Sequence, residues 1–120
     1  MPSQDFLNIF ERLKPILAGT ADMRVTIDDP VHYSLNTPVS SKTGKEIFFG
    51  AVRIQKNYVS FHLMPVYMFP DLQRDISPEL KKHMQGKSCF NFKKPDEALF
   101  NELVELTRRG VERFRASEWR

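Results

Sequence analysis

The sequence predicts an α+β fold, a two-layer α/β sandwich in which N- and C-terminal helices pack on one face of an antiparallel sheet. Apolar residues recur with helical period at both ends of the chain and alternate as in strands between them. The strand–helix–strand alternation that is typical of parallel sheets does not occur. The 120 residues fit one domain, 1–120.

The first helix is predicted over residues 3–18, where apolar residues recur at helical spacing. Ser3 is suited to cap its N-terminus, and Gly19 is suited to end it. Because proline lacks a backbone N–H and its ring crowds the preceding turn, Pro15 predicts a kink or break near residues 12–14. The apolar stripe consists of Phe6, Phe10, Leu13 and Leu17.

Two short extended segments should follow this helix. Residues 23–27 alternate as a strand, and the Asp-Asp-Pro of residues 28–30 ends it because proline cannot donate to a ladder. Residues 31–35 form a second extended segment. Residues 40–45 have the composition of a mobile turn.

The clearest unit is a β-hairpin over residues 46–64. Two runs rich in β-forming residues flank Lys56 and Asn57, and asparagine tolerates the positive φ that a tight turn requires. Alternation then places Tyr58, Ser60 and His62 on the face opposite the core. The predicted core side consists of Val52, Ile54, Val59, Phe61 and Leu63.

Short elements connect the hairpin to the last strand. Residues 65–70 are predicted to be a turn that exposes Tyr67 and Phe69, and residues 71–75 a short helical turn. Ser77 and Pro78 then open a short helix, since serine caps helices and proline is favoured at their first position. This helix is expected to end near Gly86.

The chain should close with a strand and a long helix. Residues 88–92 alternate as a strand, and the helix runs from Pro95-Asp96 to about Ala116. Glu97 near its start and the arginines near its end suit the helix dipole.

Gly86-Lys87-Ser88 resembles the end of a phosphate-binding P-loop, but its context excludes that motif. A P-loop needs a glycine five residues before Gly86, where this chain has Lys81. The motif also lies between a strand and a following helix, whereas here a helix precedes and a strand follows. Gly86 fits better as a helix C-cap.

The charge is distributed unevenly along the chain. Eighteen basic and 15 acidic residues give a net charge of +3, and residues 81–95 contain five lysines and no acid. This segment is a solvated face or a surface for an acidic protein partner. Nucleic acid is disfavoured, because Glu105, Glu112 and Glu118 dilute the arginines of the last helix. The five lysines are Lys81, Lys82, Lys87, Lys93 and Lys94.

Candidate chemistry centres on the second hairpin strand. His62 shares its face with Tyr58 and Ser60, which suggests a polar ligand-binding cleft. Cys89, the single cysteine, excludes an intrachain disulfide, and its basic surroundings could lower its pKa. No Ser-His-Asp or Cys-His set can be assembled by spacing, so the sequence predicts a binding domain rather than an enzyme. The cleft would comprise Tyr33, His62, Tyr67 and Lys87.

The ends and the hydropathy of the chain indicate a cytoplasmic protein. The N-terminus lacks a basic leader followed by an apolar stretch. No apolar run approaches the roughly 18 residues of a membrane span.

From the hairpin onward, over residues 46–114, the chain resembles the YdhG-like family of small bacterial proteins of unknown function. The resemblance rests on IFFGAVRIQKNYVSFHLMPVY, on PELKKHMQGKSCFNFK and on the final helix with its acidic start. It implies a frataxin-like α/β sandwich, a superfamily whose best-known members bind iron and assist iron–sulfur cluster assembly. By this resemblance, Asp22, Asp28 and Asp29 would form the metal side.

Two hypotheses follow. The first is a non-enzymatic domain that binds a metal ion, with iron implied by the resemblance, or an acidic partner protein. The alternative is a small-molecule binding module with a polar pocket around His62.

Overall fold

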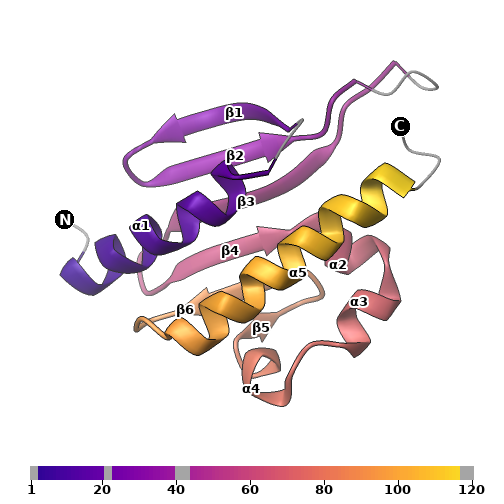
Figure 1. Cartoon of the computed structure of the whole chain (residues 1–120). Helices are drawn as coiled ribbons and strands as arrows, with labels where there is room; N and C mark the ends of the chain where they lie inside the picture. The colour runs from indigo at the N-terminus through magenta and orange to yellow at the C-terminus, as the bar shows by residue number, and fades with distance from the viewer. Residues whose placement is uncertain (1–2, 21–22, 40–43, 117–120) are drawn as a thin grey trace.

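The computed structural model describes residues 3–20, 23–39 and 44–116. Helices lie at both ends of the chain and β-strands between them, so the predicted α+β class is confirmed (Figure 1). In chain order the elements are α1 (Gln4–Ala18), β1 (Arg24–Asp29), β2 (His32–Asn36), β3 (Phe48–Ile54), β4 (Val59–Leu63), α2 (Met64–Met68), α3 (Pro70–Arg74), α4 (Pro78–Lys81), β5 (Met84–Gln85), β6 (Cys89–Phe92) and α5 (Glu97–Ala116).

The six strands form one antiparallel sheet in the order β1-β2-β3-β4-β6-β5. The two long helices α1 and α5 cross the same face of this sheet (Figure 1). The short helices belong to that layer too, since α2 and α3 contact α5 and Leu80 of α4 joins the same core. The predicted packing of both terminal helices on one face is therefore confirmed. Among the described elements, the opposite face of the sheet carries no helix.

The core lies between the sheet and the helices. A row of cross-strand partners on this side joins Tyr33, Val52, Phe61 and Phe90, one residue from each of β2, β3, β4 and β6. All four are buried, and burial of such side chains contributes about 1.5–3 kcal/mol each. The hairpin is therefore correctly predicted, with its apolar residues facing the helices.

Helix α1 begins where the sequence predicted. Ser3 Oγ accepts a hydrogen bond from the backbone N of Phe6 at 3.1 Å, as an N-cap should. Pro15 was predicted to cause a kink or a break near residues 12–14; the helix is not broken there and continues to Ala18. Proline costs this helix one hydrogen bond, whereas Leu13 and Leu17 on either side are completely buried. Burial of this face therefore outweighs the local penalty.

Close packing of α1 on β3 requires a glycine. A Cβ atom at Gly50 would lie 2.9 Å from the carbonyl oxygen of His62 and 3.1 Å from Cδ2 of Leu17. The absence of a side chain at this position lets the helix approach the sheet.

The segment that follows β4 differs from the prediction. Residues 64–68 form the helix α2 rather than a turn, and Val66 of this helix is completely buried. Phe69 was predicted to be exposed, but it is partly buried. Its ring packs edge to face against that of Phe114, with the ring centroids 5.9 Å apart. Tyr67 is exposed, as predicted.

The segment before β6 also differs. The helix that Ser77 caps ends at Lys81, and β5 follows before Gly86. Gly86 is not a helix C-cap but lies in the tight β5–β6 connection, where its φ of +75° is one that glycine adopts without strain. The half-buried Met84 packs against the core, which explains why a strand replaces the last helical turn. Residues 40–43 of the predicted mobile turn lie outside the described residues.

Candidate functional site: the uncovered sheet face and the lysine pocket

The face of the sheet opposite the helices carries small and polar side chains. The strand registers align Ser34, Ala51, His62, Cys89 and Gln85 in one row across β2, β3, β4, β6 and β5. A parallel row aligns His32, Arg53, Ser60 and Asn91. We refer to this surface as the uncovered face.

Four side chains on the uncovered face form a connected polar group, which we call the His62–Cys89 network. His62 Nε2 lies 3.6 Å from Cys89 Sγ. Cys89 Sγ donates to Asn91 Oδ1 at 3.3 Å, and Asn91 Nδ2 donates to Gln85 Oε1 at 2.8 Å. The network thus brings a thiol, an imidazole and an amide oxygen together on rigid strands.

The protonation states in the network follow from burial. Burial, assisted by the nearby His32, lowers the pKa of His62 below its ordinary value. Burial raises the pKa of Cys89, whereas the sequence suggested that neighbouring lysines would lower it. Lys87 is exposed, so desolvation of the half-buried thiol dominates. The pair is therefore a neutral thiol beside a neutral imidazole rather than an activated thiolate.

Sequence reasoning missed this pair. His62 and Cys89 are 27 residues apart, and they become neighbours because β6 pairs with β4. The sequence did indicate that both strands have a polar face. Each has a polar residue at every second position, and the residues between them are buried phenylalanines and aliphatic residues.

A hollow of about 670 Å³ adjoins the network at Asn91. His83 in its wall stacks on Phe92 with ring centroids 4.7 Å apart, and its Nδ1 lies 2.9 Å from the carbonyl oxygen of Asn91. Asp96 caps the N-terminus of α5: its Oδ1 accepts a hydrogen bond from the backbone N of Leu99 at 3.2 Å. We call this hollow the lysine pocket; it is lined by Tyr58, Lys82, His83, Met84, Asn91, Lys93, Lys94, Pro95 and Asp96.

The charge of the lysine pocket is only partly neutralised, because three lysines line it with a single carboxylate, that of Asp96. Within residues 3–20, 23–39 and 44–116, no carboxylate forms an ion pair with Lys82, Lys93 or Lys94. All three lysines are exposed. Like charges gathered around a concave surface focus a positive potential, which attracts anions.

The four residues predicted to form a cleft around His62 do not come together. Tyr33 is 5% exposed and belongs to the core row, with its ring 5.1 Å from Nζ of Lys14. His62 lies on the opposite face of the sheet, so the two side chains cannot line one cleft. Tyr67 is 58% exposed on α2, and Lys87 lies in the β5–β6 connection. The alternation of Tyr33 with His32 places the tyrosine on the core side.

The carboxylates implied as a metal side are engaged separately. Asp28 Oδ1 accepts from Nζ of Lys14 at 2.9 Å, whereas Asp29 Oδ1 accepts from the backbone N of Val31 at 3.0 Å. As neighbours in β1 they point to opposite faces, and Asp22 lies outside the described residues. In the described part of the chain, no three His, Cys, Asp or Glu residues are grouped to hold a metal ion.

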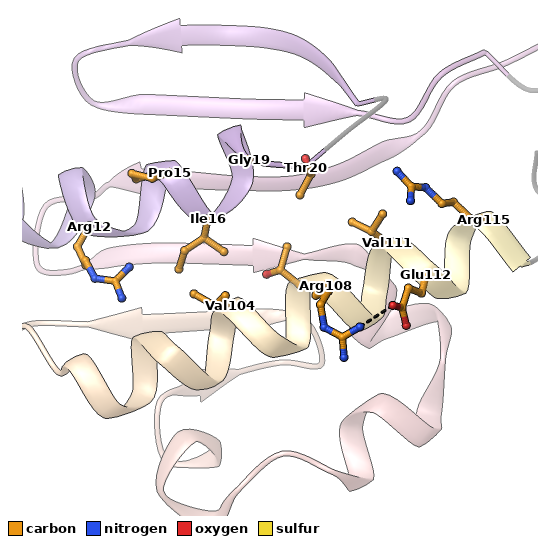
Figure 2. A pocket seen from close by; sticks show the side chains of 11 residues that line it. Arg12, Pro15, Ile16, Gly19, Thr20, Val104, Arg108, Val111, Glu112 and Arg115 are labelled. Carbon is orange, nitrogen blue, oxygen red and sulfur yellow. Dashed lines mark hydrogen bonds and ion pairs between the residues drawn. The ribbon is translucent and has the colours of Figure 1, made fainter.

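A second hollow, of about 560 Å³, lies between α1 and α5 (Figure 2). Its wall includes the apolar Ile16, Val104 and Val111. Two arginines at its edge are already paired. Arg12 pairs with Glu97, and Arg108 pairs with Glu112; Figure 2 marks the second of these pairs by a dashed line. This hollow therefore offers less uncompensated charge than the lysine pocket.

Comparisons of the chain with protein-family models, with curated proteins and with solved structures gave no match. Of the helices that the structure describes, none has the length and apolar character to cross a membrane.

Proposed function

We propose that this domain is a binding module for an acidic segment of a partner protein, which it holds in the lysine pocket. The observation that carries the proposal is that Lys82, Lys93 and Lys94 line one hollow with a single carboxylate, Asp96, and form no ion pair among the described residues. A partner carboxylate would supply the missing counter-charge, and charge-assisted hydrogen bonds are stronger than neutral ones.

A polar neighbour of the lysines adds a directional contact. Tyr58 lines the same hollow, and its hydroxyl can donate a hydrogen bond to, or accept one from, an extended peptide. Nucleic acid fits less well, because phosphate binding generally uses a longer basic stripe. The arginine-rich helix α5 offers no such stripe here, since Arg108, Arg109 and Arg113 all pair with carboxylates.

The test is fluorescence anisotropy with a labelled peptide of alternating glutamate and serine. The variant K82Q/K93Q/K94Q should weaken binding by about 10-fold or more, since three charge pairs are lost. The matched control K56Q/K81Q/K87Q removes the same number of exposed lysines outside the pocket and should weaken binding by only about twofold. A peptide in which glutamine replaces glutamate should not bind. Equal losses in both triple variants would show that total charge, not the pocket, attracts the peptide.

We further propose a YdhG-like, frataxin-like assignment and a cytoplasmic location. The family assignment is supported by the sequence signature over residues 46–114 and by the α+β layout that this signature implies. The associated iron binding is tested by anaerobic titration with ferrous iron and two-dimensional amide NMR. Local broadening at α1 and at Asp28 and Asp29, abolished in D22N/D28N/D29N, is the expected result. A spectrum that stays unchanged in excess iron would exclude it.

A further inference from the structure

The His62–Cys89 network has the composition of a transition-metal site. Thiolate and imidazole are the ligands that Zn²⁺ and related ions prefer, and an amide oxygen can add a weaker bond. In the described chain the network is the place where the sulfur of Cys89 meets a ring nitrogen. Both side chains are half-buried on the uncovered face, where no described helix blocks the approach of an ion.

We propose that His62 Nε2, Cys89 Sγ and Asn91 Oδ1 bind a zinc-type divalent ion, with the remaining coordination position open to solvent. This site is separate from the carboxylates implied by the family resemblance. Asn91 also lines the lysine pocket, but metal binding does not require that a peptide binds there.

The interatomic distances match those of a metal site. Bonds of about 2.3 Å to sulfur and about 2.0 Å to nitrogen place the two ligand atoms of a tetrahedral zinc site roughly 3.5 Å apart. Sγ of Cys89 and Nε2 of His62 are separated by 3.6 Å. Asn91 Oδ1 lies 3.3 Å from the same sulfur, so the sulfur has a nitrogen and an oxygen donor close to it on the same face of the sheet.

Neighbouring groups hold the three donors in place. Gln85 accepts from Nδ2 of Asn91, which turns Oδ1 of that amide toward the sulfur. The ring of Phe48 packs at 6.4 Å, edge to face, against the imidazole of His62. Direct pairing of β4 with β6 fixes the backbones of both strands. Such outer contacts orient ligands and reduce the cost of ordering them when an ion binds.

Binding replaces one proton by one ion. The Cys89 thiol transfers its proton to solvent as the sulfur–metal bond forms, and the neutral His62 donates the lone pair of Nε2. Asn91 donates oxygen electrons without losing a proton. No oxidant, reductant or further reactant is required.

The test is a titration of the purified protein with Co²⁺, which replaces zinc and gives a sulfur-to-cobalt absorption band in the near ultraviolet. The wild-type protein should show a saturable band that Zn²⁺ displaces. H62Q should lower the Co²⁺ affinity by at least about 10-fold, and N91A by a smaller factor. C89S should abolish the band and the saturable binding.

Two control variants distinguish binding at this site from binding elsewhere on the protein surface. H32Q removes a histidine that lies on the same face but does not contact the Cys89 sulfur, so this variant should bind Co²⁺ as the wild type does. K82Q/K93Q/K94Q should retain the Co²⁺ site and bind the ion at least as tightly as the wild type, because it removes positive charge near Asn91. Failure of the lysine-pocket proposal would therefore not affect this result. Circular dichroism melts of the metal-free variants verify folding, and Zn²⁺ should raise the melting temperature of the wild type but not of C89S. Undiminished Co²⁺ affinity in H62Q, or equal zinc stabilisation of C89S, would overturn the proposal.

Discussion

The two faces of the sheet are built from the same strands but are stabilised differently. On the helix side, neighbouring strands present Val52, Phe61 and Phe90, all completely buried. The residues next to Phe61 in β4 and to Phe90 in β6 are His62 and Cys89. Their side chains face away from the helices and contact each other. The covered face contributes stability through volume and apolar area. The uncovered face uses small and polar side chains, which leaves it available for binding.

The sharpest test of this contrast compares adjacent positions of β4. Phe61→Ala should lower the free energy of unfolding by about 3–5 kcal/mol, because it leaves a cavity among completely buried neighbours. Ser60→Ala, on the other face, loses a 3.4 Å contact to the carbonyl oxygen of Arg53 and should cost about 1 kcal/mol or less. Urea denaturation measures both values. Comparable losses at the two positions would contradict the division into two faces.

A second, smaller effect is expected where α1 approaches the sheet. Gly50→Ala should destabilise the protein by roughly 1–3 kcal/mol, since the new methyl group would meet the backbone of His62 and the side chain of Leu17. Thermal unfolding followed by circular dichroism gives the change. Gly44→Ala is the control for clash, because a Cβ atom there meets nothing within 4 Å and only its φ of +69° is unfavourable. A neutral or stabilising Gly50→Ala would show that the helix can move away from β3.

The uncovered face should govern a pH dependence that the covered face lacks. His62 has a lowered pKa, so below its ordinary value of 6.5 the unfolded chain takes up a proton that the folded protein resists. Stability is therefore retained above pH 6.5 and lost as the pH falls. Cys89 has a raised pKa, so above its ordinary value of 9.0 the unfolded thiol ionises first, and stability is lost as the pH rises.

Denaturation of the metal-free protein across this pH range measures both slopes. H62Q should flatten the acid side and leave the alkaline side unchanged, whereas C89S should do the reverse. An acid slope that persists in H62Q would show that His62 is not the group responsible.

The smallest effect is expected at the ion pair between α1 and the edge strand. Asp28→Asn removes the 2.9 Å contact with Nζ of Lys14; the Asp28 side chain is 57% exposed and that of Lys14 is 36% exposed. The change should cost about 0.5 kcal/mol or less, and it should vanish in high salt. Urea denaturation at low and high ionic strength measures this difference. A large, salt-independent loss would mean that Asp28 has a further role.

Local patterns predicted much of the fold. Alternation assigned Val52, Phe61 and Leu63 to the core side because their strands are amphipathic, and such a period is a property of adjacent residues. Ser3 was recognised as a cap for the same reason, since its partner Phe6 is three residues away.

Long-range pairing explains what was not predicted. The contact of His62 with Cys89 depends on β6 lying next to β4, which no local period encodes. Gly86 was wrongly predicted to be a helix C-cap, because glycine with a positive φ occurs both at helix ends and in tight hairpins. Which of the two forms here depends on how Met84 packs against the core. The hollow among Lys82, Lys93 and Lys94 likewise requires that β5 and β6 be paired.

The two margins of the sheet bear on how this protein behaves when its molecules are crowded together. An open strand edge is a template on which another chain can add a strand and begin to aggregate. At one margin β5 is only two residues long, and at the other β1 has an irregular register between Val25 and Ile27 and carries Arg24, Asp28 and Asp29. Short length, irregularity and charge each oppose strand addition, so this sheet is built to end within one molecule rather than to grow into a fibril.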